Sequence, residues 1–137
     1  MNKLEELKKW VKEELTVTEI NNLGKNKEKV KQLLGITADG RIVFKIDLSK
    51  LLAKEVISLY MIGKVYAQIA GYVETETVTN KELIEALRFP EGTIGYTLKE
   101  LRDDKIIIAE KTGVHRISND KIGVVLDSIF KKIQNRP

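Results

Sequence analysis

The chain has 137 residues, a formal net charge of +4, no cysteine and a single histidine. The absence of cysteine excludes disulfide bridges and thiolate metal sites, and one histidine cannot by itself build a histidine metal site or catalytic triad. The hydrophobic fraction of 42% and the charged fraction of 32% are typical of an ordinary globular protein rather than a disordered one. This length predicts one domain or two very small ones.

Neither the N-terminus nor the longest apolar stretch has the composition of a targeting or membrane segment. The N-terminus carries Glu5, Glu6, Glu13 and Glu14 among its lysines, which argues against a signal or transit peptide. The longest apolar stretch, residues 51–73, contains Lys54, Glu55 and Lys64, which argues against a membrane span. We therefore expect a cytoplasmic protein.

Catalysis has little support in the sequence. A general base near neutral pH is usually a histidine or a carboxylate in an apolar pocket. The only histidine falls in a predicted hairpin, and the acidic residues are scattered over predicted helix surfaces. The segment Gly92 to Gly95 is no nucleotide loop, because it lies inside a predicted helix rather than between a strand and a helix. We expect no enzymatic activity, no cofactor and no bound metal.

Residues 1–47 read as an N-terminal helical unit. An apolar stripe with a tryptophan at its edge predicts a first helix, formed by Leu4, Leu7, Trp10, Val11 and Leu15. Thr16 and Glu19 have capping-box spacing and open a short helix that ends at Gly24. A further helix is predicted over about 26–34. The Asp39-Gly40 turn then joins a short strand at 36–37 to a strand at 41–46.

Two interpretations of this unit remain open. It is either a degenerate helix-turn-helix with a short hairpin, whose turn glycine is Gly24, or a three-helix cap packed on the rest of the chain. In the first interpretation a second DNA-facing basic surface is formed by Lys25, Lys27, Lys29 and Lys31. Lysines alone would contact phosphates without reading sequence. In the second they are a solvated helix face.

The stretch from residue 48 to 71 predicts a long central helix that is apolar nearly all round and hence buried. Gly63 in its middle costs about 1 kcal/mol relative to alanine, which predicts that another helix crosses closely there. The surplus apolar surface must pack on the N-terminal unit, on the last helix or on a second copy. Together with the apolar stripe of the first helix it predicts a homodimer. The alternative is that the two surfaces cover each other within one chain.

Residues 79–118 carry the most informative pattern. Thr79 and Glu82 have capping-box spacing, and the short helix that they open must end before Pro90. A second helix begins at residues 90–91 and ends at 103–104, with an inward stripe of Ile94, Leu98 and Leu101. A β-branched run at 106–108, a turn at 111–113 and a returning strand at 114–118 predict a hairpin. Asn119 and Asp120 then cap a last amphipathic helix.

This order of elements resembles the winged helix-turn-helix DNA-binding superfamily over residues of about 51–134. The positions that match its usual pattern are Glu82, Leu83, Ile84, Leu87, Pro90, Gly92, Thr93, Ile94, Gly95, Leu98, Leu101, Ile106 and Ile107. The resemblance implies a mainly α protein with a small β-hairpin wing, in which residues 48–137 form the winged-helix domain. It also implies that residues 90–104 form the recognition helix and residues 110–116 the wing.

The side chains expected to face DNA follow from that arrangement: Arg88, Thr93, Tyr96, Lys99, Arg102, Lys111, His115 and Arg116. Thr93 and Tyr96 are expected to reach phosphates or a thymine methyl, and Lys99 and Arg102 to meet phosphates or guanine. These residues predict a transcriptional regulator or chromatin-associated factor that binds double-stranded DNA as a dimer. Acidic neighbours such as Glu91, Glu100 and Asp103 favour the alternative, a winged-helix adaptor that binds a protein partner and no DNA.

Overall fold

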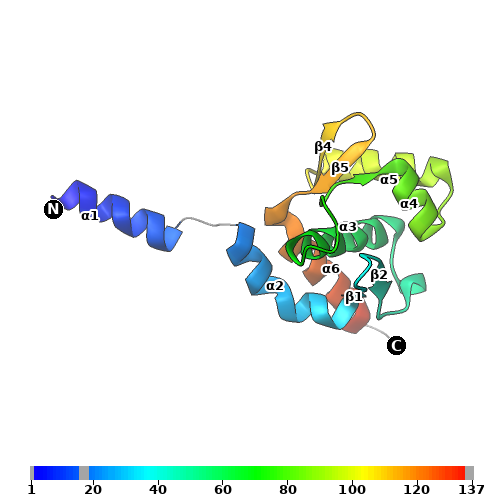
Figure 1. Ribbon diagram of the computed structural model, residues 1–137, viewed down its shortest axis with the longest axis horizontal. Helices are drawn as coiled ribbons and strands as arrows, with labels where there is room; N and C mark the ends of the chain where they lie inside the picture. The colour runs from blue at the N-terminus through cyan, green and yellow to red at the C-terminus, as the bar shows by residue number, and fades with distance from the viewer. Residues whose placement is uncertain (1, 16–18, 135–137) are drawn as a thin grey trace.

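The computed structural model describes residues 2–15 and 19–134, and it confirms a mainly helical chain with small antiparallel sheets. One sheet has two strands in the order β1-β2, and the other has three strands in the order β3-β5-β4. The long helix α3 lies at the centre, with α5 and the β4–β5 hairpin on one side and α2 on the other (Figure 1). No helix in the described ranges is long and apolar enough to cross a bilayer.

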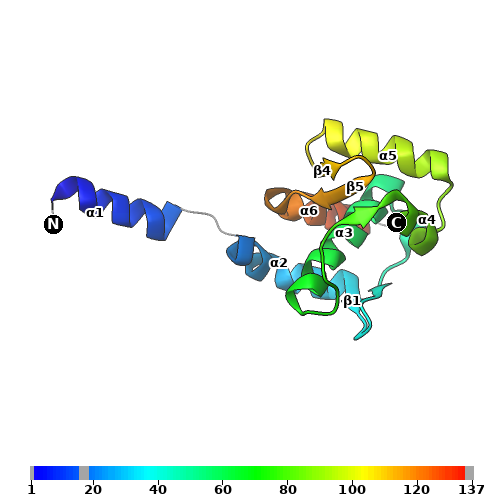
Figure 2. The same ribbon diagram turned by 45° about the horizontal axis from the view of Figure 1, so that its top comes forward.

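The first residues form an arm, which we call the N-terminal arm (residues 3–15). It consists of α1 (Lys3–Trp10) followed by a π-helical segment, η1 (Val11–Leu15). Asn2 caps α1, because its side-chain oxygen accepts from the amide of Glu5 at 2.8 Å. No residue of this arm is buried, and α1 lies clear of the other helices in both views (Figures 1 and 2). The Thr16 half of the predicted capping box lies outside the described residues.

Helix α2 (Glu19–Leu33) is continuous, so the predicted turn at Gly24 is wrong. A Cβ at this glycine would meet nothing within 4 Å, and a glycine inside a helix costs only about 1 kcal/mol. Burial of Leu23, Val30 and Leu33 along one face of α2 offsets that cost. The degenerate helix-turn-helix is therefore not formed. Helix α2 instead packs along α6 as a cap, from which the N-terminal arm is separate.

The predicted hairpin after α2 is confirmed. Strand β1 (Leu34–Ile36) pairs antiparallel with β2 (Ile42–Phe44), with Ile36 opposite Ile42. The first strand starts two residues earlier than expected. Gly40 has a φ of 89°, a left-handed conformation that the tight turn requires. The hairpin packs against α3 through both of its strands.

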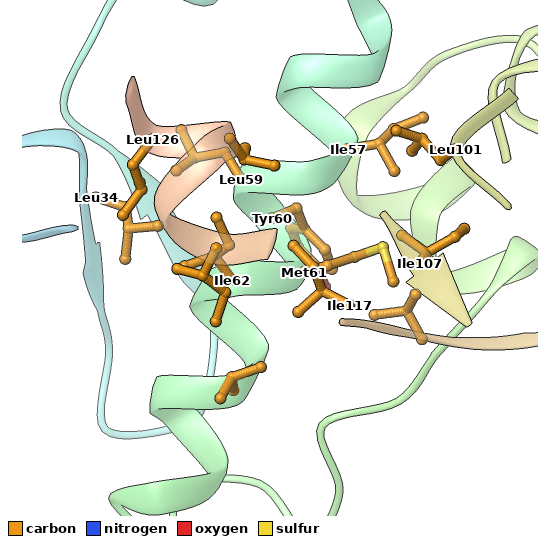
Figure 3. Packing of buried hydrophobic residues seen from close by; sticks show 14 of the residues in the cluster. Leu34, Ile57, Leu59, Tyr60, Met61, Ile62, Leu101, Ile107, Ile117 and Leu126 are labelled. Atoms are coloured by element: carbon orange, nitrogen blue, oxygen red, sulfur yellow. The ribbon is translucent and has the colours of Figure 1, made fainter. Parts of the chain in front are cut away.

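Helix α3 (Ala53–Ile69) is buried on every side from Glu55 to Val65, as predicted. Ile57 and Met61 point toward the α5 side of the core, and Leu59 and Ile62 toward the α6 side (Figure 3). The apolar surplus of α3 is therefore covered within one chain and requires no second copy. A Cβ on Gly63 would lie 2.9 Å from Cδ1 of Ile42, so a hairpin strand, not a helix, crosses there.

The elements predicted over residues 79–118 are confirmed as α4 (Asn80–Leu87), α5 (Glu91–Asp103), β4 (Ile107–Lys111) and β5 (Val114–Ile117). A short strand, β3 (Val78–Thr79), was not predicted and pairs with β5. The amide of Glu82 donates to Thr79 Oγ1 at 3.1 Å, which confirms one half of the capping box. The other half is not formed, because the Glu82 carboxylate binds Lys64 and Tyr60 of α3 instead.

Helix α6 (Ile122–Gln134) closes the fold after a 3-10 turn, η3 (Asn119–Lys121). Its predicted apolar face is confirmed, with four buried residues that lie against α2 and α3: Ile122, Val125, Leu126 and Ile129. Phe130 and Ile133 are partly buried at the edge of the same face. Lys132 of α6 binds the buried carboxylate of Glu55 at 2.7 Å, which joins the start of α3 to the last turn of α6.

Candidate nucleic-acid interface

Helix α5 presents one face to the core and the opposite face to solvent. Ile94, Leu98 and Leu101 are at most 1% exposed and pack against α3 and α4. The proline before the helix sets its start, because Pro90 has no amide hydrogen to satisfy and its carbonyl accepts from the amide of Ile94. Figure 2 shows α5 along the surface of the molecule with the β4–β5 hairpin against it. The outer face of α5 is therefore accessible along its length.

Tyr96 is the most prominent side chain of that outer face, with 72% of its surface exposed. Thr93 is half-buried beside it, and Gly92 and Gly95 are exposed with nothing within 4 Å of a Cβ built on them. The phenol of Tyr96 thus projects from a part of the helix that has little other side-chain bulk. Such a surface lets another molecule approach the α5 backbone closely.

The charges of this face are partly neutralised by their neighbours. Lys99 lies 3.4 Å from the carboxylate of Asp103, and Arg116 Nε lies 2.9 Å from that of Glu110. Three further cations, Arg88, Arg102 and Lys111, are exposed and have no salt bridge to any residue within the described ranges. Those three cations are therefore not neutralised by a salt bridge among the described residues.

His115 does not belong to the exposed face, which corrects the expectation from the sequence. The residue is 3% exposed, and its Nε2 lies 3.1 Å from Oδ1 of Asn80. Side chains alternate along a strand, so the inward position of Ile117 also turns His115 inward. Burial lowers the pKa of the imidazole below its ordinary value, and the positive charge of Arg102 lowers it further.

The four lysines of α2 do not form one surface. Successive residues of an α-helix are about 100° apart, which sets Lys25 and Lys29 on one side of the buried face and Lys27 and Lys31 on the other. Lys29 also binds Asp127 of α6 at 2.5 Å. Both views place α2 and α5 on different sides of α3 (Figures 1 and 2). The predicted second basic surface is thus split and remote from the first.

Two cations that the sequence reading missed lie beside the end of α5. Lys105 and Lys121 share a shallow hollow with Arg102 and with the carboxylate of Asp120, beside residues 107–109 of β4. Lys105 has a φ of 59°, a left-handed conformation that ends α5 and turns the chain toward β4. The two lysines are far apart in sequence, and only the pairing of β4 with β5 brings them together. No local pattern signals such a pair.

In the described part of the chain, histidine and acidic side chains nowhere gather in a group of three or more that could hold a metal ion. No protein-family model, curated protein or solved structure matches this chain.

Proposed function

We propose that residues 48–134 form a winged helix that binds double-stranded DNA, with α5 as the recognition helix and the β4–β5 hairpin as the wing. The protein would act as a transcriptional regulator or chromatin-associated factor. The observation that carries the proposal is the division of α5 into a packed face and an exposed face that adjoins the hairpin. An α-helix with a free face fits the major groove of B-DNA, which is about 12 Å wide.

The exposed side chains are assigned to two roles, contacts with phosphates that position the protein on DNA and contacts with base edges that read the sequence. Arg88, Arg102 and Lys111 lack acidic partners among the described residues and are assigned to phosphates. Tyr96 and Thr93 are assigned to base edges, because they lie on the outer face of α5 where the glycines leave room. Few free cations imply few displaced counterions, so affinity for non-specific DNA will be modest and will depend only weakly on salt.

Replacement of the hairpin cations tests the phosphate contacts. Lys111→Ala with Arg116→Ala should weaken binding to all duplexes to a similar extent, and should lower the salt slope by roughly one unit per lost contact. Most of the change should come from Lys111, because Arg116 is already bound to Glu110. Fluorescence anisotropy with a mixed-sequence duplex at roughly 50 and 200 mM salt measures both effects.

The matched control is Lys27→Ala with Lys31→Ala, which removes the same charge from exposed positions of α2. We expect this pair to leave DNA binding unchanged. Tyr96→Ala and Thr93→Ala should instead change the preference among sequences. A folded protein that binds no duplex at roughly 50 mM salt would overturn the proposal.

A second candidate function is recognition of a protein partner by the same face. It is favoured by the 72% exposed tyrosine, since tyrosine is enriched at protein interfaces, and by the Lys99–Asp103 pair, which reduces the positive charge that this face offers to phosphates. A photo-crosslinking amino acid at position 96 separates the candidates inside cells. Crosslinks to nucleic acid support the DNA proposal, and crosslinks to protein alone support an adaptor.

A further inference from the structure

The N-terminal arm carries an apolar stripe that nothing in the described chain covers. Four large side chains remain more than half exposed on it: Leu4 at 60%, Leu7 at 56%, Trp10 at 51% and Leu15 at 57%. Positions 4, 7, 11 and 15 follow the i, i+3, i+4 repeat and lie on one side of the arm. A contiguous exposed stripe of this kind marks a contact surface.

The charges of the arm favour a protein surface over a membrane. A helix that lies on a membrane has a polar face rich in lysine and arginine. The polar face here has equal numbers of both signs, with Lys3, Lys8, Lys9 and Lys12 against Glu5, Glu6, Glu13 and Glu14. A helix this short is also marginal in water by itself, so it gains most from packing against another helix.

We propose that the arm pairs with the arm of a second copy, antiparallel and related by a two-fold axis near Lys9. Such a pairing sets Leu7 at the level of the second copy's Val11, and Leu4 at the level of its Leu15. The apolar residues of one stripe then face those of the other along the whole arm. An isologous contact of this kind is the commonest way in which identical chains associate.

The flanking charges select the antiparallel direction. In that direction Lys3 comes beside the second copy's Glu14, and Glu5 comes beside its Lys12, so opposite charges meet on both flanks. Lys9 lies at the level of the axis but on the side of the helix away from the stripe, so the one like-charged approach near the axis is that of Lys8 to its own copy. In a parallel pair, Lys3 of one copy would lie beside Lys8 of the other, because flanking residues five positions apart meet in that direction. Like charges would then come together at the start of the arm.

The antiparallel direction also brings the first turn of each arm to the level of Leu15 in the other. On the rest of the described chain further apolar side chains are exposed: Ile20 at 73%, Ile69 at 58% and Tyr72 at 46%. The start of α2 and the end of α3 meet, since the Tyr66 hydroxyl donates to the carbonyl of Leu23 at 2.6 Å. The start of α2 and the end of α3 thus present a second exposed apolar surface.

Sedimentation of the full chain tests the pairing. Two short arms bury less than the roughly 1,200 Å² of a stable interface, so we expect a micromolar dimer. Between about 1 and about 100 µM the mass should rise from 15.6 kDa toward twice that value. Leu7→Glu should raise the dissociation constant by about 30-fold or more, the effect of losing a central buried contact.

The control is Val124→Glu, which adds the same charge at a 60% exposed apolar position of α6. It should leave association unchanged, and thermal unfolding should show that both variants remain folded. A mass of 15.6 kDa at about 100 µM would overturn the proposal. Equal effects of the two variants would overturn it as well.

Disulfide trapping tests the direction of the pair, because the chain has no cysteine of its own. Lys3→Cys mixed with Glu14→Cys should give a mixed disulfide under oxidation. Homodimers of Lys3→Cys alone would overturn the antiparallel arrangement. Co-sedimentation of monomeric protein with phosphatidylserine vesicles would assign the arm to membranes instead. None of these readouts depends on DNA, so the arm proposal and the DNA proposal fail independently.

Discussion

Helices α3 and α5 both have a glycine near the middle, and the two glycines have opposite surroundings. Gly63 of α3 lies against Ile42 of the first hairpin, whereas Gly95 of α5 has open space around it. The difference extends to the whole helices, because α3 is buried on every side and α5 is buried only along one stripe. The sequence of α3 is thus constrained by packing, while half of α5 is available for contact with another molecule.

The charged residues of the two helices differ in the same way. Lys64 of α3 is 8% exposed and lies 3.0 Å from the Glu82 carboxylate, which also accepts from the Tyr60 hydroxyl at 2.7 Å. Lys99 and Asp103 of α5 form a pair in which both side chains are largely exposed. A buried ion needs its partner, whereas an exposed pair contributes little to stability. Substitutions in α3 should therefore affect folding, and substitutions on α5 should affect binding.

The largest effect is expected for Glu82→Gln, which leaves the ammonium of Lys64 buried without an opposite charge. Loss of one partner of such a pair destabilises the fold by about 2–3 kcal/mol when the pair retains some contact with solvent. Urea unfolding measures this change. Lys64→Met combined with Glu82→Gln should recover part of the loss, since the uncompensated charge is then gone. Equal stabilities of the single variant and the wild type would show that the network does not hold α4 to α3.

The next effect concerns pH and the buried side of the second hairpin. His115 has a pKa below its ordinary value of 6.5 because of burial and of Arg102. As the pH falls below about 6.5, the unfolded chain binds a proton before the folded chain does, so the folded state loses stability. The loss is at most about 1.4 kcal/mol per pH unit and ends at the folded-state pKa.

His115→Gln should remove this dependence, which unfolding measurements at pH 7.5 and 5.5 would reveal as a smaller difference than in the wild type. Glu76 has a pKa raised by burial and by Glu19, and its effect has the opposite sign, because the folded state takes up its proton first. That effect is common to both proteins and therefore cancels when the two pH dependences are compared. A wild-type difference retained in His115→Gln would assign the dependence to another group.

Local sequence patterns were sufficient for α4, α5 and the β4–β5 hairpin. The stripe of Ile94, Leu98 and Leu101 identifies the buried face of α5 without knowledge of its neighbours. Gly24 led to the prediction of a break in α2. Leu23, Asn26, Val30 and Leu33 nevertheless lie on one helical face that continues past this glycine. That continuity was the signal for an unbroken helix.

Other features depend on contacts between distant residues. Strand β3 has two residues, too few for an alternating pattern, and it exists because β5 offers an edge. Which face of β5 meets the core, and with it the inward position of His115 two residues before Ile117, is set by the pairing of β5 with β3 and β4. The Lys64–Glu82 pair joins two helices that the sequence reading treated separately. None of these three features can be predicted from the spacing of apolar residues along a short segment.

The two glycines allow a direct test with the same small substitution. Gly95→Ala should stabilise the fold by about 1 kcal/mol, because alanine is the better helix former and the added methyl meets nothing. Gly63→Ala should destabilise it by about 1 kcal/mol, since Ile42 must move away from a Cβ only 2.9 Å from its Cδ1. Thermal unfolding of both variants gives the signs. Stabilisation by both would show that the contact with Ile42 relaxes freely.

The smallest effect on stability is expected for Lys99→Met. Lys99 and Asp103 are four residues apart on the exposed face of α5, and exposed pairs of this spacing contribute about 0.3–0.5 kcal/mol. Screening by salt reduces even that contribution, so the unfolding free energies of variant and wild type should coincide at high salt. Under the proposed function Lys99 is already bound to Asp103, so its loss should lower the affinity for duplexes at low salt less than the loss of Lys111 does. An unchanged free energy of unfolding together with a lowered affinity for DNA would show that this face of α5 serves binding rather than packing. A loss of stability as large as that of Glu82→Gln would mean that the outer face of α5, like α3, contributes to the stability of the fold.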